Sequence, residues 1–192
     1  WWPADAIASL IAAVPEGSLL LLDEAYGEFA PPGTLPPLDT SNPRVLRFRT
    51  FSKAYGMAGL RVGYAIGHAE VIRAFDKVRN HFGVTRIGQA AAIAALAGQQ
   101  HLETVLRKTA EAKAAIATIA TGCGLLPLPS ATNFVTIDCG GSEQAKAILN
   151  GLPARGIFAR MPSIAPRNRC IRITACSPAA LEHSGKALAA LP

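Results

Sequence analysis

The chain contains no long uncharged apolar run. Four consecutive leucines, Leu19 to Leu22, are ended by Asp23, whereas a membrane-spanning helix needs about 20 apolar residues. The sequence therefore does not predict an integral membrane protein or a membrane partner. No basic segment followed by an apolar one opens the chain, so we expect no signal or transit peptide and a cytoplasmic location.

Cysteine is also scarce. The 192 residues include four cysteines and four scattered histidines. The cysteines stand at positions 123, 139, 170 and 176, and no two of them are spaced as CxxC or in a pattern typical of zinc sites. We therefore expect reduced thiols, no disulfide framework and no metal site.

Acidic residues are fewer than basic ones. Thirteen Asp and Glu residues face 19 Lys and Arg residues, which gives a net charge of +6. The basic residues form no tract interleaved with aromatic residues, so we expect no nucleic-acid partner, although a polyanion-binding protein stays open as an alternative. Between Arg155 and Arg172 there are five arginines and no acidic residue. Such a cluster favours a small anionic ligand, a carboxylate or a phosphate.

The N-terminus lacks methionine. The chain begins Trp1-Trp2-Pro3 and enters at once a segment with helical spacing of apolar residues. We therefore expect that the sequence begins inside a longer protein. With 50% hydrophobic residues, the 192 residues are nevertheless enough to bury a core.

The periodicity of apolar residues predicts an α/β protein. We expect helices at 3–14, 68–80, 87–96, 100–120, 142–152 and 179–191, and strands at 18–23, 44–50, 62–66, 133–138, 156–159 and 170–175. The strand at 18–23 is apolar on both faces and is predicted to be buried. The segment 122–130 is the predicted linker between a first unit, 1–121, and a small α+β unit, 122–192, with a bridge between the units by the preceding long helix as the alternative.

The stretch from Thr50 to Tyr64, TFSKAYGMAGLRVGY, carries the densest set of functional side chains and lies on a loop between two predicted strands. Hydroxyl groups from Thr50 and Ser52 and the guanidinium of Arg61 are the groups expected around a bound phosphate. Lys53 is a candidate amine nucleophile. Taken alone, the stretch also fits a solvated turn that contains glycine.

Asp23 is a second candidate, because it ends a strand at the place where ligands bind in open α/β sheets. A carboxylate at this position either caps the following turn or faces a protonated ring nitrogen of a ligand. A lysine amine, an acid for a pyridine nitrogen and hydroxyls with an arginine for a phosphate are the groups that pyridoxal phosphate requires. We therefore predict this cofactor.

The two motifs DEAYGEF (23–29) and TFSKAYGMAGLRVGY (50–64) together resemble the fold type I, class II pyridoxal-phosphate aminotransferases, most nearly the histidinol-phosphate aminotransferases. The resemblance covers essentially the whole chain, which is similar to the C-terminal half of the family's chain. It implies the C-terminal part of a large domain with a mostly parallel sheet and helices, followed by a small α+β domain that binds substrate. It also implies a homodimer that acts on amino acids and 2-oxo acids.

The resemblance further implies roles for single residues. Lys53 would be the Schiff-base lysine and proton shuttle, Asp23 would pair with the pyridinium nitrogen, and Tyr26 would hydrogen-bond the cofactor's phenolic oxygen. The residues implied around the cofactor phosphate are Ser52, Arg61 and, as a weaker candidate, Thr50.

In the small unit, Arg172 resembles the arginine that binds the substrate α-carboxylate, and Arg160 resembles a second substrate-side arginine that helps with a phosphate end. Arg160 also fits a solvated edge position, and we interpret the remaining arginines of this region, Arg155, Arg167 and Arg169, as surface residues.

Two departures from the family keep alternatives open. The segment 81–86 differs from that of histidinol-phosphate enzymes, so an aromatic amino acid aminotransferase or a phospho-amino-acid decarboxylase on the same scaffold stays possible. The family's upstream half is missing from this sequence, and a truncated, inactive fragment that acts as a binding module is the remaining alternative.

Overall fold

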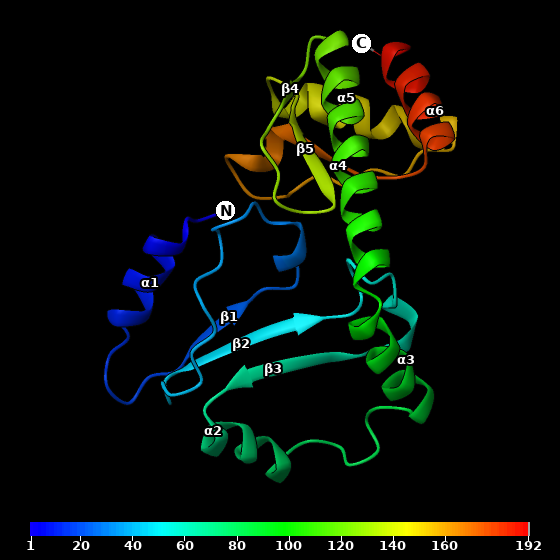
Figure 1. Ribbon diagram of the computed structural model, residues 1–192. Helices are drawn as coiled ribbons and strands as arrows, with labels where there is room; N and C mark the ends of the chain where they lie inside the picture. The colour runs from blue at the N-terminus through cyan, green and yellow to red at the C-terminus, as the bar shows by residue number, and fades with distance from the viewer. Residues whose placement is uncertain (192) are drawn as a thin grey trace. The chain divides into compact units, whose positions relative to one another are not determined.

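The computed structural model describes residues 1–191, and Figure 1 shows its helices and strands. The chain divides into two compact units, Trp1–Val105 and the part from Leu106 onward. Within the described residues, no helix combines the length and apolarity needed to cross a bilayer.

The first unit is built on a three-stranded mixed sheet (Figure 1). Strands β1 and β2 are parallel, and β2 pairs with β3 in the antiparallel sense. The elements in order are α1 (Ala4–Ala12), β1 (Leu20–Asp23), the 3-10 turn η1 (Gly27–Phe29), β2 (Val45–Thr50), the 3-10 turn η2 (Ala58–Leu60), β3 (Gly63–Gly67), α2 (Ala69–Ala74), the 3-10 turn η3 (Phe75–Lys77), α3 (Arg86–Ala97) and the start of α4 (Gln99–Gly122). The expected α/β class is confirmed.

The prediction that residues 18–23 are buried on both faces is wrong. Leu19 and Leu21 are 54% and 61% exposed, and β1 lies at an edge of the sheet. Side chains alternate along a strand, so Leu21 and Asp23 share one face, and both line the open pocket described below. This face of β1 is therefore free to contact a ligand.

The predicted helix at 68–80 is shorter than expected. Helix α2 ends at Ala74 and continues for one 3-10 turn to Lys77. Helix α3 begins at Arg86, one residue before the predicted start, and the Thr85 hydroxyl that precedes it accepts a hydrogen bond from the Gly88 amide at 3.0 Å. Such a bond satisfies an amide that the helix itself leaves unpaired.

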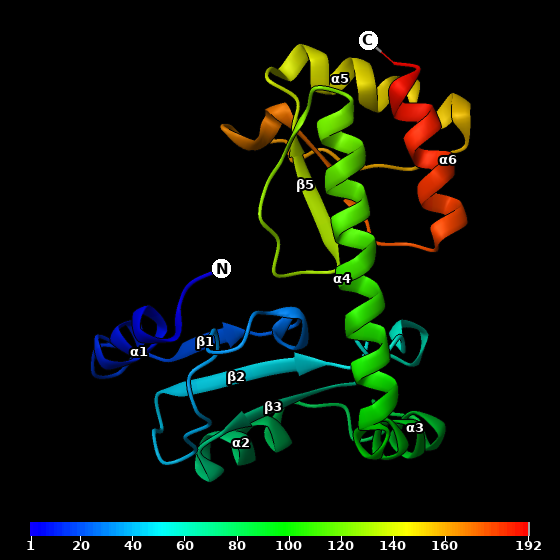
Figure 2. The ribbon, with the colours of Figure 1, turned by 45° about the horizontal axis from the view of Figure 1, so that its top comes forward.

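The second unit contains an antiparallel sheet in the order β4-β5-β6. Its elements after α4 are β4 (Leu126–Pro127), β5 (Phe134–Asp138), α5 (Ser142–Gly151), the 3-10 turns η4 (Pro153–Arg155) and η5 (Arg167–Arg169), β6 (Cys170–Thr174) and α6 (Pro178–Ala189). Figure 2 shows β5 beside the helices of this unit. The short strand β4 lies within the segment predicted as a linker.

The strand predicted at 156–159 is not formed. Gly156 has a positive φ of 72° and closes the turn η4, after which the Ile157 amide donates back to the Leu152 carbonyl at 3.1 Å. Because residues 153–157 are used in this turn, the segment forms no continuous strand. Arg160 alone forms an isolated antiparallel bridge, with Arg172.

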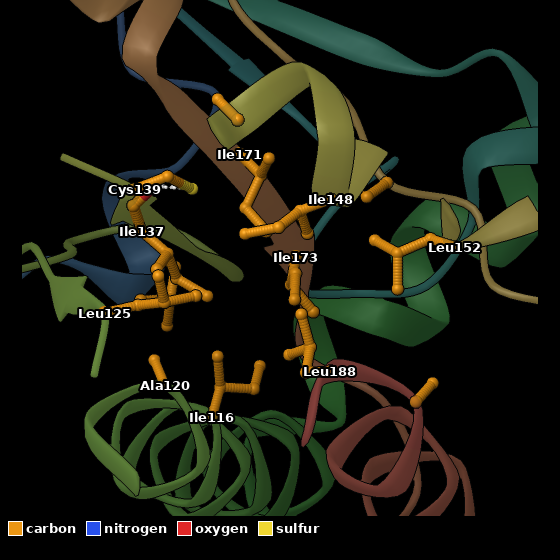
Figure 3. Close-up of a cluster of buried hydrophobic side chains, with 14 of the residues drawn as sticks. Ile116, Ala120, Leu125, Ile137, Cys139, Ile148, Leu152, Ile171, Ile173 and Leu188 are labelled. Atoms are coloured by element: carbon orange, nitrogen blue, oxygen red, sulfur yellow. Dashed lines mark hydrogen bonds between the residues drawn. The ribbon is translucent and has the colours of Figure 1, made fainter. Parts of the chain in front are cut away.

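One apolar core holds the second unit together. On β5 and β6 the inward residues Val135, Ile137, Ile171 and Ile173 are at most 6% exposed, and helices α4, α5 and α6 contribute to the same cluster. Figure 3 shows Ile137, Ile171 and Ile173 among the side chains that gather in this core. The residues that alternate with them on β5 are only half-buried, so the outer face of this sheet is left for other contacts.

The helix α4 belongs to both units. Contacts divide between Val105 and Leu106, inside this helix, whereas the sequence suggested a division between residues 121 and 122. Ala112, Ile116 and Ala120 of α4 are buried in the core of the second unit, because their apolar stripe faces that core. Sequence periodicity finds the helix but does not show which unit covers it.

Candidate active site

The Lys53 loop connects β2 to β3 and is held in place by buried apolar side chains. Phe51, Ala54 and Val62 are 3%, 1% and 7% exposed, and the Phe51 ring packs against Tyr55 and Tyr64 at centroid distances of 5.0 and 5.5 Å. This packing fixes the loop so that Ser52 and Lys53, between the buried residues, remain partly accessible. The two tyrosines thus pack against the buried ring of Phe51.

Hydrogen bonds also shape the loop. The Thr50 hydroxyl donates to the Val62 carbonyl at 3.4 Å and accepts from the Ser52 amide at 3.0 Å, and the Met57 amide donates to the Phe51 carbonyl at 2.9 Å. The hydroxyl proton of Thr50 is therefore engaged in a hydrogen bond within the loop. This geometry gives Thr50 a role in orienting Ser52.

A pocket of about 630 Å³ opens on the face of the sheet that carries Asp23, a size in the range of small-molecule sites. Four of the residues predicted for the cofactor line it, namely Asp23, Thr50, Ser52 and Arg61. Leu21, Phe48 and Phe75 add an apolar lining, and the two phenylalanine rings meet edge to face at 6.5 Å. The pocket thus joins an apolar surface to a few polar groups.

Arg61 has an unusual backbone. Its φ of 54° makes it the one residue other than glycine with a positive φ among residues 1–191. This conformation is sparsely populated for residues with a Cβ and costs of the order of 1 kcal/mol. The side chain donates to the Ala58 carbonyl at 2.9 Å and lies 3.5 Å from the Ser52 hydroxyl. The strained backbone thus brings the guanidinium and the hydroxyl together.

Lys53 and Tyr26 lie beside each other although they are 27 residues apart in sequence. The Lys53 Nζ is 5.4 Å from the centroid of the Tyr26 ring, within the range of a cation–π contact. Both side chains are partly buried. The structure therefore joins the predicted nucleophile to the segment that follows β1.

Asp23 has the turn-capping role suggested by its position. Its Oδ1 accepts a hydrogen bond from the Ala25 amide at 2.9 Å, which orders the turn after β1. Within residues 1–191 the carboxylate forms no ion pair with a lysine or arginine, and it is exposed at the pocket. It can therefore still face a cationic group of a ligand.

A buried ion-pair network that sequence reasoning missed supports the strand ends. Glu24 accepts from Arg47 Nε at 2.6 Å and from Arg49 Nε at 3.1 Å, and Arg47 also donates to the carbonyls of Pro36 and Pro37 at 2.9 Å. Arg47 and Glu24 are 3% and 7% exposed. Charged residues in an otherwise apolar strand are the sequence signal that could have indicated it, because buried charges need partners.

Glu28 extends this charged layer. Burial raises the pKa of its carboxyl, while the nearby Arg49 opposes the rise. Neither carboxyl oxygen meets a hydrogen-bond donor from another residue in the described part of the chain. Burial, and then the charge of Glu28, also raise the pKa of the Tyr55 hydroxyl.

In the second unit, Arg160 and Arg172 are brought together by a backbone bridge. The Arg172 amide donates to the Arg160 carbonyl at 2.7 Å, and the Arg160 amide returns a bond at 3.3 Å. The Arg172 guanidinium lies 4.5 Å from the centre of the Phe134 ring, and that of Arg160 lies 5.7 Å from Phe158. Neither arginine forms an ion pair with a residue in the described range. Both guanidinium groups are therefore available to an anion.

The residues of the first unit fit pyridoxal phosphate by their chemistry. The pocket offers a carboxylate without an ion pair, a hydroxyl beside an arginine, and apolar side chains for a ring. The amine of Lys53 lies 5.4 Å from the ring centroid of Tyr26, which is on the segment after β1. The described residues contain no cluster of His, Cys, Asp or Glu suited to a metal ion.

These features define a class of protein, and the comparison with known families gives the same result. The profile of the family "Aminotransferase class I and II" matches residues 1–188. The chain belongs to this family.

Particular relatives are similar over large parts of the chain. One is the crystal structure of histidinol-phosphate aminotransferase from Sinorhizobium meliloti in complex with pyridoxal 5'-phosphate, which is 51% identical in sequence and superposes with a TM-score of 0.96. The match covers 98% of this chain and 53% of the Sinorhizobium chain. The aromatic amino acid aminotransferase of Mycobacterium avium is 43% identical over 143 residues, which are 73% of this chain and 40% of the relative. A putative aminotransferase from Burkholderia pseudomallei is 29% identical with a TM-score of 0.76, over 89% of this chain and 52% of its own.

The chain spans about half the length of these relatives or less, 53% of the Sinorhizobium protein and 40% of the Mycobacterium one. The resemblance inferred from the two motifs is confirmed at the level of the family and its fold.

Proposed function

We propose that this chain is part of a pyridoxal-phosphate-dependent aminotransferase that acts on histidinol phosphate with 2-oxoglutarate as amino acceptor. The observation that carries the proposal is the pocket in which Asp23, Ser52 and Arg61 converge at the Lys53 loop. The 51% identity to the Sinorhizobium enzyme supports the substrate. A role in histidine biosynthesis, a homodimer and a cytoplasmic location complete the proposal.

The residues that line the pocket, and Tyr26 beside the Lys53 loop, have distinct tasks in this proposal. Ser52 and Arg61 hold the phosphate, and Thr50 orients Ser52 through its hydrogen bond. The Asp23 carboxylate would pair with the ring nitrogen and favour its protonated form. Tyr26 donates to the phenolic oxygen, and its ring borders the Lys53 amine.

Lys53 would hold the cofactor through its amine, and the same amine would take up and return a proton at the substrate carbon. When bound, pyridoxal phosphate supplies an electron sink for the carbanion formed at the substrate. The first unit would therefore bind the cofactor. Arg172 of the second unit would bind the carboxylate of the amino acid or 2-oxo acid through two charge-assisted hydrogen bonds, and Arg160 a second anionic group.

The test is performed on the full-length protein loaded with pyridoxal phosphate. Borohydride reduction followed by peptide mass spectrometry is expected to find the cofactor attached to Lys53. We expect Lys53→Ala to lose this attachment and at least about 10²-fold in kcat. Lys77→Ala, an exposed lysine of the same unit, is the matched control and should retain both. Attachment of the cofactor to another lysine would overturn the proposal.

An aromatic amino acid aminotransferase is the second candidate, because the Mycobacterium avium enzyme is 43% identical over 143 residues. The two candidates are separated by measuring kcat/KM for histidinol phosphate and for phenylalanine, each with 2-oxoglutarate. A higher value for histidinol phosphate supports the first candidate, and a higher value for phenylalanine supports the second.

A further inference from the structure

Arg172 stands between an aromatic ring and a carboxylate on the outer face of the small sheet. Its register partner on β5 is Thr136. Side chains two residues apart share a face of a strand, so Phe134 and Asp138 flank Thr136 on the face of Arg172, one in each direction. A long side chain can reach either diagonal neighbour on an antiparallel pair.

The Arg172 guanidinium is directed toward the Phe134 ring and not toward Asp138. Its Cζ is 4.5 Å from the centre of Phe134, and Arg172 forms no ion pair with Asp138. Charge alone would favour a contact of Arg172 with Asp138 over one with Phe134. A carboxylate offers an arginine two parallel charge-assisted hydrogen bonds, which an aromatic ring does not.

Arg169 explains why Arg172 does not pair with Asp138, because Arg169 already forms an ion pair with that carboxylate. Arg169 Nε donates to Oδ1 and Nη2 to Oδ2, both at 2.7 Å, and the Gly140 amide donates to Oδ1 at 2.8 Å. Both carboxylate oxygens are thus engaged. Arg169 and then Gly140 lower the pKa of the Asp138 carboxyl, with a smaller contribution from the charge of Arg167.

The backbone of Arg172 is fixed on both sides. It pairs with Thr136 on β5 and with Arg160 through the isolated bridge on the opposite edge. A guanidinium on such a rigid strand, with no carboxylate of its own, binds an incoming anion with little loss of conformational freedom.

We propose that Arg169 is a positioning residue that, by occupying Asp138, keeps the Arg172 guanidinium free to bind a substrate carboxylate. The proposal rests on the proposed function, in which Arg172 is the carboxylate-binding residue. It gives a role to Arg169, which the sequence alone suggested to be a surface arginine, and to Asp138.

The experiment compares Arg169→Met, Asp138→Asn and the double variant in the full-length protein loaded with pyridoxal phosphate. In Arg169→Met, Asp138 is free to pair with Arg172 and competes with the substrate. We expect KM for glutamate, the amino acid formed from 2-oxoglutarate, to rise about tenfold with kcat nearly unchanged, the pattern of binding lost equally in the ground state and the transition state. The dissociation constant of maleate, an inert dicarboxylate, should rise by the same factor in calorimetry.

The double variant separates this role from a structural one. Asp138→Asn breaks the same ion pair but leaves no competing charge, so alone, or combined with Arg169→Met, it should keep KM within about twofold of the parent. If the ion pair served stability only, Asp138→Asn would be as harmful as Arg169→Met. That result, or failure of the double variant to restore KM, would overturn the proposal.

A structural readout is independent of catalysis. The crystal structure of Arg169→Met is expected to show the Asp138 carboxylate hydrogen-bonded to Arg172, and a carboxylate still turned away would refute the proposal. Arg107→Met breaks the exposed pair with Glu111 in the same unit and is the control expected to change nothing. Arg172→Met tests the proposed function separately: unchanged KM for glutamate would refute the carboxylate role of Arg172 itself.

Discussion

Replacing Glu24 by glutamine is expected to destabilise the protein far more than replacing an exposed acid. The side chains of Glu24 and Arg47 are only 5% and 4% exposed, and their Oε1 and Nε are 2.6 Å apart. Removing the charge of Glu24 leaves Arg47 buried without a counter-charge. Breaking a buried ion pair by removing one partner costs about 3–5 kcal/mol.

The second contact of Glu24 adds less to this cost. The Arg49 side chain is 21% exposed, so water can replace part of what it loses, and partly exposed pairs contribute about 0–1 kcal/mol. We therefore expect Glu24→Gln to lower the free energy of unfolding by roughly 3–5 kcal/mol. Because Glu24 directly follows Asp23, cofactor affinity should fall as well.

The assay is urea unfolding of the full-length protein without cofactor, followed by circular dichroism and extrapolated to water. Glu111→Gln is the matched control, since its pair with Arg107 is 62% exposed on both sides, and it should cost less than about 1 kcal/mol. A Glu24→Leu/Arg47→Met double variant should be less harmful than Glu24→Gln, because the buried Arg47 charge is removed together with its partner and only the partly exposed Arg49 loses an ion pair. If Glu24→Gln costs no more than the control, the reasoning about burial is refuted.

Three further predictions concern other parts of the structure. Ile137→Ala should lower the free energy of unfolding by about 2–5 kcal/mol in urea titrations, since Ile137 is fully buried in the core of Figure 3. Gly63→Ala should cost about 1–3 kcal/mol in the same titrations, because a Cβ would stand 2.9 Å from the Arg49 carbonyl oxygen. Glu28→Gln should raise the melting temperature at pH 7, by a stability gain on the order of 1 kcal/mol.

The pH dependence of Glu28→Gln follows from the raised pKa of Glu28. As pH rises, Glu28 loses its proton at a lower pH in the unfolded chain than in the folded one. The protein with Glu28 therefore loses stability between the unfolded and the folded pKa of this carboxyl. The gain of the variant should therefore vanish near pH 4. A gain of equal size at pH 4 and pH 7 would contradict the explanation.

The other two predictions have matched controls of the same residue type. Ile164→Ala removes an isoleucine that is 78% exposed, and Gly59→Ala adds a Cβ with no atom within 4 Å. Both should be close to neutral. Costs similar to those of Ile137→Ala and Gly63→Ala would argue against the packing reasons given.

Local sequence determined much of this protein. The alternation in 133–138 and 170–175 predicts β5 and β6, and the position of Lys53 between two strands follows from the apolar runs around it. The motifs that contain Asp23 and Lys53 also indicate the family, because the side chains a cofactor requires stand at fixed places on the chain.

Tertiary structure decided what depends on distant neighbours. Whether Leu21 is covered depends on what lies on its face of the sheet, and whether residues 156–159 pair depends on the turn at Gly156. The partner of Asp138 is Arg169, 31 residues away, and only the register of β5 against β6 shows that Arg172 is left without it. Periodicity describes a residue's own element, whereas pairing and burial are set by elements remote in sequence.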